Sequence, residues 1–487
     1  MSSEKTGSHP ILVTGATGYI GGKLVPLLLS KEYRVRCLAR NADRLQGRPW
    51  QNSVEVVKGD VLKPETLSDV MQHVKAAYYL IHSMGSGSGF HERDLRAAEN
   101  FSRAAHSAGV ERIIYLGGLA TDSTDLSEHL RSRLETGKSL RTAGVPVTEF
   151  RAGVIVGSGS ISFEMIRYLT ERVPVMICPR WVYTRTQPIG INDVMDYLVS
   201  ALEVPESAGH IVEIGSSDIT TYGAMMTTYA KVRGLKRRML PVPVLTPRLS
   251  SYWVNLVTPI PANIARPLID GLRNENIVSD PVARKFFPDI QPKSYQSAVE
   301  RALKYLQAEH FENIVNNALL KNQKSDFVAV KEGMILEHRQ RTVHAHHSNV
   351  YRVFTGLGGK QGWLYMNWAW KIRGAIDRMF GGADMRNHVR DSNELKVGDA
   401  LDFWRVEKIR PKELLRLKAE MKVPGQAWLQ FQVKPVSNQQ CLLAQTAFFA
   451  PKGLVGVLYW YALYPVHKLI FNGLINRIAQ RAVENTC

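Results

Sequence analysis

Three glycines in the segment TGATGYIGG have the types and spacing needed to hold the phosphates of a dinucleotide. Gly15, Gly18 and Gly21 follow an apolar run at residues 11–14 and open a segment with helical periodicity. The first glycine allows a tight turn, the second lets the backbone approach a pyrophosphate, and the third lets helix and strand pack closely. The helix N-terminus adds unpaired N–H groups and a positive dipole end. The pattern predicts a dinucleotide site, and the alternative is a glycine-rich turn without ligand.

The next strand bears on the choice of cofactor. NAD-preferring sites usually place an acidic residue about twenty positions on, where it bonds the ribose 2′-hydroxyl. Here that strand ends in Arg40, with Arg44 one turn later, and their planar donors suit a 2′-phosphate. We therefore expect NADP(H), with NAD as the alternative, although both arginines are also compatible with a plain solvent-exposed strand end. The residues between the glycines, Thr17, Tyr19 and Ile20, complete the predicted contacts of the turn.

Apolar runs that alternate with stretches of helical length must position this turn. Such alternation predicts a parallel sheet covered on both faces, a doubly wound α/β fold of the Rossmann type. Strands are expected at 11–14, 34–39, 54–57, 76–81, 112–116, 147–150 and 211–214.

The C-terminal part has a different pattern. Alternate residues from Leu415 to Val423 share an apolar face opposite Arg416 and Lys418, and residues 427–433 repeat the alternation. This indicates an antiparallel sheet with one solvent-exposed face. The final helical stretch, at 455–483, is long enough to span a membrane. Its proline and charged residues favour instead a helix that covers the sheet: Pro465, His467, Lys468 and Arg477.

These patterns divide the chain into domains. We expect a flexible N-terminus at 1–9, a nucleotide-binding domain at 10–325 and a further domain at 345–487. The first domain includes a substrate-side subdomain at about 216–300. Within it, repeated prolines between 241 and 272 exclude a straight membrane helix.

Composition narrows the function classes. With 487 residues, 45% hydrophobic and 22% charged, the chain is typical of a globular enzyme or binding protein. Its four cysteines lie far apart and the first ten residues lack an apolar signal core, so we expect a cytoplasmic protein. The net charge is +18, and the densest basic cluster lies at 231–238. Because no aromatic residues alternate with these charges, we expect no nucleic acid, while peripheral contact with a membrane stays possible.

At the glycine turn the chain resembles the extended and atypical short-chain dehydrogenase/reductase superfamily, in particular its NmrA-like branch. The resemblance covers roughly residues 10–300 and also rests on Gly59 with Asp60, YLIHSM at 79–84 and QPIGINDV at 187–194. It implies an NAD(P)-binding Rossmann domain. It also implies that Asp60 and Val61 border the adenine, and that three residues run beside the nicotinamide ribose: Ile81, His82 and Ser83.

The resemblance also raises a question about the chemistry. Members of the superfamily normally carry a Tyr-x-x-x-Lys pair on the helix after strand five, where the tyrosine protonates the carbonyl that receives hydride. Here that helix reads SEHLRSRLETGKSL, without tyrosine, and the aligned residues are His129 and Arg133, preceded by Gly117 and Gly118. Histidine titrates near neutrality and can act as the acid, whereas arginine contributes only positive charge. Alternatively, both residues form a polar helix face or pack the lid.

The segments GGKQGWLYMNWAW, DFWRVE and YWYALYPVHKLIF resemble an uncharacterised domain that follows such dehydrogenase-like domains in bacteria. That domain looks related to the START and polyketide-cyclase folds, an α+β helix-grip architecture that commonly encloses an apolar cavity. Eight aromatic residues suit a lipophilic ligand, and core packing is the alternative for each: Trp363, Tyr365, Trp368, Trp370, Trp404, Trp428, Tyr459 and Trp460. A metal site is not expected at His344, His346 and His347, because neighbours in an extended segment point to opposite faces.

Three functions remain open. The leading hypothesis is an NADP(H)-dependent oxidoreductase for a lipophilic carbonyl, quinone or isoprenoid-like substrate. The second is a non-catalytic NADP(H)-binding regulator or scaffold, which the missing tyrosine would permit. The third is a peripheral membrane lipid-binding protein. Substrate, reaction direction and oligomeric state do not follow from the sequence.

Overall fold

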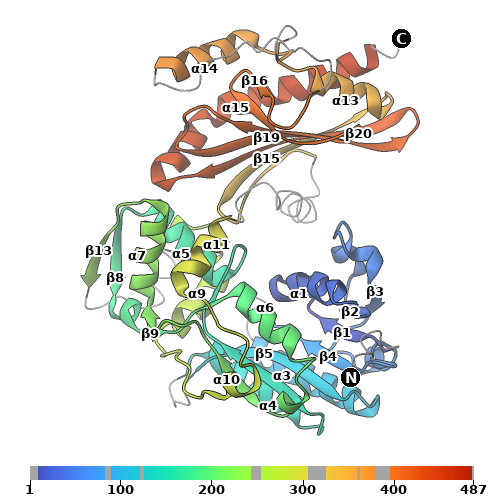
Figure 1. The fold of residues 1–487 in the computed structure, drawn as a ribbon, viewed down its shortest axis with the longest axis vertical. Coiled ribbons are helices and arrows are strands. Elements are labelled where there is room, and N and C mark those ends of the chain that lie inside the picture. Colours follow the sequence, from blue (N-terminus) through green and yellow to red (C-terminus); the bar gives the residue numbers. More distant parts are fainter. Residues whose placement is uncertain are drawn as a thin grey trace. The chain divides into compact units, whose positions relative to one another are not determined.

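The computed structural model describes residues 9–82, 89–120, 126–242, 254–304, 325–358, 362–379 and 395–484. The chain forms two compact units, Met1–Tyr305 and Leu306–Cys487 (Figure 1). Each unit has its own sheet and its own hydrophobic core. Three cysteines are free and buried: Cys37 and Cys178 in the first unit and Cys441 in the second.

The first unit is built on a parallel sheet of seven strands with the order β11-β6-β5-β4-β1-β2-β3. The expected Rossmann-type α/β fold is therefore confirmed, and its strands lie close to the expected positions. Because both faces of this sheet are covered, β1, β2 and β4 are buried at every residue. The strands are β1 (Ile11–Thr14), β2 (Val35–Ala39), β3 (Glu55–Lys58), β4 (Ala76–Tyr79), β5 (Arg112–Gly118), β6 (Val147–Ala152) and β11 (Ile211–Ile214).

Helices pack on both faces of this sheet (Figure 1). One core includes residues of α1 (Tyr19–Ser30) and α6 (Ile191–Ser200). The opposite core includes residues of α2 (Leu67–Met71), α3 (Phe90–Ser107) and α4 (Glu128–Arg141). The strand order changes direction between β1 and β4, which is the place where open α/β sheets bind ligands outside the carboxyl ends of their strands.

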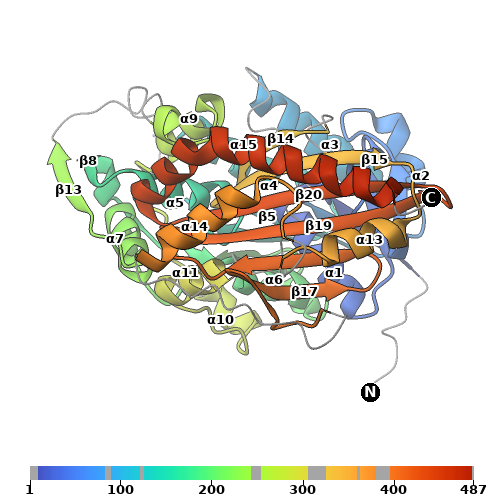
Figure 2. The ribbon, with the colours of Figure 1, turned by 90° about the horizontal axis from the view of Figure 1, so that it is seen from above.

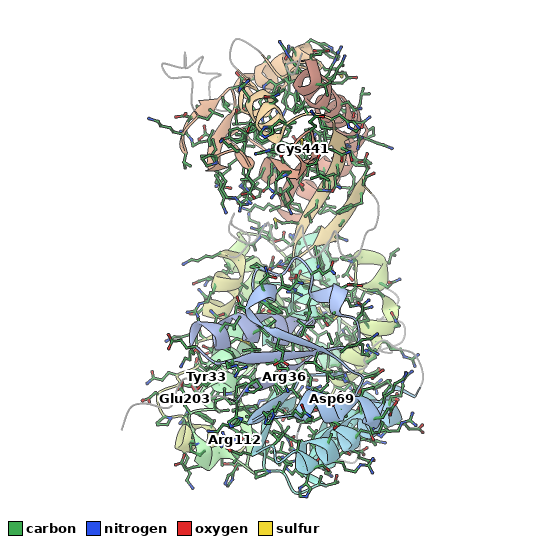
Figure 3. All side chains as sticks on the ribbon, turned by 90° about the vertical axis from the view of Figure 1, so that its right-hand side faces the viewer. Tyr33, Arg36, Asp69, Arg112, Glu203 and Cys441 are labelled. Atoms are coloured by element: carbon green, nitrogen blue, oxygen red, sulfur yellow. The ribbon has the colours of Figure 1, made fainter. Side chains whose placement is uncertain are left out.

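Two buried arginines connect strands of this unit to neighbouring segments through hydrogen bonds (Figure 3). Arg36 on β2 donates to Glu55 at 2.9 Å and to the carbonyl oxygens of Val70 and Gln72. Arg112, which begins β5, donates to the carbonyl oxygens of residues 201, 204 and 205. Buried guanidinium groups are tolerated here because several acceptors satisfy each of them.

A smaller layer of helices and short strands completes the first unit. Within it β8 (Val175–Pro179) pairs in parallel with β13 (Arg238–Val242), so the layer includes segments before the expected start at 216. The basic cluster contributes to packing, because Arg233 contacts Glu171 at 2.6 Å. Residues 243–253 of the proline-rich stretch lie outside the described residues. The other elements are β7 (Ile155–Val156), α5 (Ile161–Arg172), β9 (Arg185–Thr186), β10 (Ile189–Gly190), β12 (Thr220–Thr221), α7 (Tyr222–Arg233), α9 (Ala262–Gly271), α10 (Val282–Phe286) and α11 (Tyr295–Lys304).

The second unit contains a separate antiparallel sheet of seven strands in the order β14-β15-β20-β19-β18-β17-β16. Its first two strands precede residue 345, so the expected start of this domain was too late. The reason is that β15 pairs with β20 from Ile335↔Phe449 to Val343↔Cys441 and belongs to the same sheet. The strands are β14 (Phe327–Lys331), β15 (Met334–Val343), β16 (Ala400–Leu401), β17 (Trp404–Arg410), β18 (Leu414–Ala419), β19 (Gly425–Ser437) and β20 (Gln440–Pro451).

Three helices pack on one face of this sheet: α13 (His347–Thr355), α14 (Asn367–Met379) and α15 (Gly453–Glu484) (Figure 2). The second half of α15 buries Ile470, Phe471 and Leu474 in the core, as expected of a covering helix. Among the described helices, α15 is the one long and apolar enough to cross a membrane by length and composition, and 22% of its most apolar window is buried.

The face of the sheet that was expected to be solvent-exposed is exposed at Glu420 and Lys422 but buried at its centre, where the expectation is wrong. Arg416 is 0% exposed and Gln430 is 3% exposed, although both point away from the helix-covered core. They are buried as bonded polar groups: Arg416 Nε donates to Gln430 Oε1 at 2.9 Å, and Trp428 Nε1 donates to Glu407 at 3.1 Å. Polar alternation predicted the sheet but not the burial of its second face, because hydrogen-bonded polar side chains can be buried too.

The corrected boundary can be tested by truncation. A chain of residues 325–487 should be soluble and melt cooperatively, because it contains its own sheet and core. A chain of residues 345–487 should aggregate, since β20 loses β15, its partner along nine residue pairs. Thermal unfolding followed by circular dichroism checks both, and equal behaviour of the two chains would contradict the boundary.

Candidate cofactor and catalytic site

The glycine turn between β1 and α1 is closed by backbone contacts that exclude side chains. Gly15 has φ +69°, and a Cβ there would lie 2.5 Å from the Leu80 carbonyl oxygen after β4. A Cβ on Gly21 would lie 2.5 Å from the Gly15 carbonyl oxygen. Both positions therefore require glycine, as the sequence indicated. The turn is fixed directly against the end of β4.

The start of α1 forms an open cradle. Gly18 is the N-cap residue and makes no side-chain capping bond, and the first turn of the helix has no acidic residue. Thr17 and Gly18 are exposed, while Tyr19 and Ile20 are half-buried. An uncapped helix N-terminus offers N–H groups and a positive dipole end to an anion. The residues present therefore fit the phosphates of a dinucleotide.

Three arginines follow β2. Arg40 and Arg44, which were predicted from the sequence, are both exposed beyond the end of the strand. Arg48, which sequence reasoning missed, lies against the turn itself: its Nη2 donates to the Thr17 carbonyl oxygen at 3.4 Å, and a Cβ on Gly22 would be 3.1 Å from its Nη1. Its Nε has no partner among the described residues, and burial lowers its pKa. The spacing of residues in the sequence does not predict this contact of Arg48 with the turn.

The residues expected beside the adenine follow β3. Asp60 Oδ1 accepts from the Leu62 N–H at 3.1 Å, which leaves its other oxygen for a ligand. The Val61 side chain is buried in the core, and its carbonyl accepts from Asn100 at 3.0 Å. The structure thus places the backbone of Val61, rather than its side chain, beside this edge.

A cluster of titratable groups, with one buried carboxylate and two half-buried histidines, lies at the ends of β4 and β5. His82, three residues after β4, bonds Asp94 of α3 through Nδ1 at 2.8 Å and His129 of α4 through Nε2 at 3.2 Å. Ser132 also donates to Asp94 at 3.3 Å. The structure therefore joins two residues that the sequence had placed separately, His82 and His129, and adds Asp94. Ile81 is half-buried beside them, and Ser83 lies outside the described residues.

The cluster favours neutral imidazoles. Burial, together with the neighbouring His82 and Arg133, lowers the pKa of His129 to about 3, against the opposing effect of Asp94. Burial also lowers the pKa of His82, against the opposing effect of its bond to Asp94. His129 by itself is therefore not protonated at neutral pH, which corrects the expectation that it titrates near neutrality.

Arg133 is engaged with the backbone. Its guanidinium donates to the Leu116 carbonyl oxygen of β5 and stacks on the Tyr115 ring at 5.2 Å. Tyr115 in turn donates its hydroxyl to the Arg133 carbonyl oxygen at 2.9 Å. The residue positions the start of α4 against β5 and adds positive charge close to both histidines.

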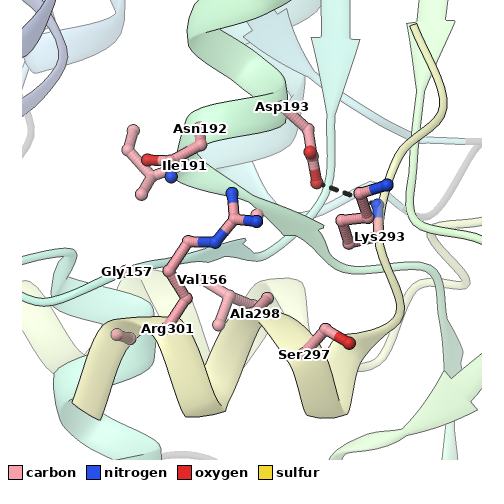
Figure 4. Close-up of a pocket in the computed structure, with 11 residues that line it drawn as sticks. Val156, Gly157, Ile191, Asn192, Asp193, Lys293, Ser297, Ala298 and Arg301 are labelled. Carbon is pink, nitrogen blue, oxygen red and sulfur yellow. Dashed lines mark hydrogen bonds between the residues drawn. The ribbon is translucent and has the colours of Figure 1, made fainter. Parts of the chain in front are cut away.

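Residues of the segment QPIGINDV, at 187–194, bond to neighbouring loops rather than to the cluster of His82, Asp94 and His129. Gln187 donates to the Ser216 carbonyl oxygen at 2.7 Å and accepts from the Val278 N–H at 3.0 Å. Asp193 accepts from the Lys293 N–H at 3.2 Å beside Arg301, at a cavity of about 20 Å³ (Figure 4). A cavity of this size holds about one water molecule, so it is no dinucleotide site.

Comparisons with known proteins agree with this geometry. The NAD(P)H-binding family matches residues 15–146. A relative named ceramide reductase, from Caulobacter vibrioides, is 30% identical over 243 residues, which cover 48% of this chain and 73% of that protein. The chain belongs to the NAD(P)-binding, NmrA-like short-chain dehydrogenase/reductase family. Its first unit is therefore an NAD(P)H-binding domain.

Two further proteins are similar to parts of the chain. The divinyl chlorophyllide a 8-vinyl-reductase of Zea mays is 31% identical over 218 residues, which cover 42% of this chain and 54% of that protein. A solved triphenylmethane reductase from a Citrobacter species shares the fold, with a TM-score of 0.50 and 21% identity over 61% of this chain and 99% of that one. These three proteins are reductases by name, whereas a relative from Cyanophora paradoxa, 24% identical over 38% of this chain and 56% of that protein, is named photosystem II assembly factor Ycf39.

The second unit matches a family described as a protein of unknown function, DUF2867, over residues 333–474. Of the eight expected aromatic residues, four lie in its helix-covered core, and Trp363 stacks on Trp370 at 4.8 Å between ring centroids. Trp428 is buried on the opposite face, whereas Trp368 is 60% exposed. Among the described residues no group of three His, Cys, Asp or Glu side chains is placed to hold a metal.

Cofactor recognition can be tested at two arginines with different roles. Arg40→Asp should weaken NADPH binding by about 1.5–3 kcal/mol and NADH binding far less, because only NADPH carries the 2′-phosphate. Arg48→Ala should weaken both cofactors alike, since Arg48 contacts the turn that both would share. Calorimetric titration measures the four affinities, with Arg34→Asp, at the opposite end of β2, as the matched charge control. An equal loss for both cofactors in Arg40→Asp would refute the NADP assignment.

Proposed function

We propose that the chain is an NADP(H)-dependent oxidoreductase that uses a relay of Asp94, His82 and His129 in place of a Tyr-x-x-x-Lys pair. The observation that carries this proposal is the continuous chain of bonds from the Asp94 carboxylate through both imidazoles. Helix α4 contains no tyrosine, and the family resemblance aligns His129 with the family's tyrosine. The relay begins three residues after β4, whose end contacts the glycine turn.

The bonds define the tautomers of the resting relay. A carboxylate only accepts, so the Nδ1–H of His82 donates to Asp94. Nε2 of a neutral His82 then accepts from the Nδ1–H of His129. Nε2 of His129 is left as a basic nitrogen with no partner among the described residues. In this state the relay can take a proton from a substrate hydroxyl.

One added proton reverses the polarity. With His82 charged against Asp94, its Nε2–H donates to Nδ1 of His129, and Nε2 of His129 carries hydrogen. When bound, NADPH supplies hydride to the carbonyl carbon. Nε2 of His129 gives its proton to the carbonyl oxygen, and Nδ1 of His129 takes the proton of His82 Nε2. The relay then has one proton fewer than the loaded relay and is back in its resting state, and the alcohol product is neutral.

The choice of NADP(H) rests on Arg40 and Arg44, because the residue that directly follows β2 is Arg40 and not an acidic residue that would bind a ribose 2′-hydroxyl. A lipophilic carbonyl, quinone or isoprenoid-like compound is the proposed substrate class. The relative named ceramide reductase supports it, because a ceramide is lipophilic. A non-catalytic NADP(H)-binding regulator is the rival function.

Substitution of the relay separates the two functions. His129→Ala should lower the turnover of carbonyl reduction by about a hundredfold or more, the usual contribution of a general acid, while NADPH affinity is unchanged. His91→Ala is the control, because His91 is a histidine of α3 paired with Glu135 at 2.9 Å outside the relay. Cofactor oxidation is measured against a panel of lipophilic carbonyls and quinones. Unaltered turnover in His129→Ala would leave the relay structural.

Asp94→Asn adds a pH readout. Because both imidazoles have lowered pKa values, the proton-loaded relay becomes more populated as pH falls below about 6.5, and reduction should accelerate in that direction. Asp94 raises the pKa of both histidines, so its neutralisation should shift the pH profile to lower pH. A variant that lowers the rate without moving the profile would show that Asp94 has only a structural role.

The second unit is proposed to bind a lipophilic ligand with a polar group, as a START-like domain would. Its helix-covered core contains buried polar atoms with no partner among the described residues, including both amide atoms of Gln445 and Oε2 of Glu337. Gln445 stands opposite Arg339 on neighbouring strands, and Arg339 pairs with Glu337. Unpaired buried polar atoms are costly, so a ligand that bonds them would be held firmly.

This proposal is tested on small molecules that co-purify with the full-length protein. Mass spectrometry of the denatured protein should detect a lipophilic compound, and Gln445→Leu should lower its yield, because the substitution removes both unpaired amide atoms. Gln432→Leu, on the same sheet and half-buried, is the control. Equal yields from both variants, or no compound from the unmodified protein, would contradict the ligand site.

A further inference from the structure

The outer surface of α14 and of the first half of α15 is apolar where a soluble helix would be polar. On α14 the exposed positions include Trp368, Ile372 and Met379, at 60%, 51% and 84% exposure. On α15 an exposed series at helical spacing contains Val455, Leu458, Ala462, Val466 and Leu469. Between residues 471 and 481 the exposed positions of the same helix are polar, and they include Asn472, Asn476, Arg477 and Gln480.

The two helices lie side by side (Figure 2). Arg373 of α14 contacts the Tyr459 hydroxyl of α15 at 3.4 Å, and the rings of Trp370 and Phe471 are 6.5 Å apart. The inner sides of both helices supply Trp370, Trp460 and Phe471 to the core. Core packing therefore does not account for the outer residues. We call this surface, made of Trp368, Ile372, Met379, Val455, Leu458, Val466 and Leu469, the apolar ridge.

Among the described residues, the solvent-accessible charges of α14 and of the first half of α15 are basic. Lys422, Lys452 and Lys468 are exposed beside the apolar ridge, and Arg373 is half-buried. Helix α14 has one acidic residue, Asp377, which is 2% exposed and accepts from the Lys422 N–H at 2.8 Å. Helix α15 has one, Glu484, at its far end. An apolar surface with basic flanks is complementary to a bilayer that contains anionic lipids.

We propose that the apolar ridge docks the protein on the surface of an anionic membrane, with α14 and α15 lying in the plane of the interface. The inner face of α15 remains on the sheet, so the helix does not need to leave the fold. An aromatic residue such as Trp368 suits the headgroup level, and the aliphatic side chains suit the outer acyl region. The proposal is independent of the relay, because it concerns the second unit alone.

Vesicle binding of the full-length protein tests this inference. The protein should co-sediment with vesicles of phosphatidylcholine and phosphatidylglycerol, and at least tenfold less with phosphatidylcholine alone or in high salt. Leu458→Glu combined with Ile372→Glu should reduce binding to the anionic vesicles at least tenfold, because both changes put charge on the ridge. Val436→Glu is the matched control, since Val436 is 63% exposed on the hairpin of β19.

Each result has a defined meaning. NADPH binding and the melting curve of the double variant must match those of the unmodified protein, as expected for exposed positions; the single changes are measured if the double variant is unstable. Equal binding of the ridge variants and the control would overturn the proposal, as would no binding by the unmodified protein. Protein that resists extraction at alkaline pH would show a membrane-spanning α15 instead. Concentration-dependent self-association that the ridge variants abolish, without vesicle binding, would assign the surface to a second copy.

Discussion

The contact between Gly15 and the carbonyl oxygen of Leu80 is the constraint on which the site depends. Because no Cβ fits between them, the turn after β1 is held against the end of β4. The same contact fixes two things at one edge of the sheet: the open N-terminus of α1, and the start of the segment that carries His82. The fold itself therefore places the phosphate cradle and the chain of titratable groups at the point where the strand order of the sheet changes direction.

The sequence predicted this edge well because its determinants are local. Glycines at fixed spacing after an apolar run report a turn, and apolar runs that alternate with helices report a parallel sheet. The bond between His82 and Asp94 could not be predicted in this way, since it joins the end of β4 to the second turn of α3. Arg48 was missed for a similar reason: a bend after β2, not a motif, brings its guanidinium to Thr17.

The second unit shows where alternation is an incomplete guide. Alternating residues identified β18 and β19, yet the polar side of that alternation includes Arg416, which is fully buried and hydrogen-bonded. Strand β15 escaped detection as part of this unit because Glu337, His338, Arg339 and Arg341 look like a polar linker. In the sheet, Glu337 and Arg339 neutralise each other, so a charged sequence is buried as a pair. Whether such charged residues are buried depends on pairing across strands, which the spacing of residues along the sequence does not predict.

The buried thiols give each unit an internal reporter of its own opening. Burial raises the pKa of Cys37 to about 12 and that of Cys441 above its usual value, so both remain as unreactive thiols while their units are closed. A thiol reagent can reach Cys37 only when the parallel sheet opens, and Cys441 only when β20 separates from its neighbours. The rates at which these two positions are alkylated would therefore compare the lifetimes of the two folded units within one intact chain.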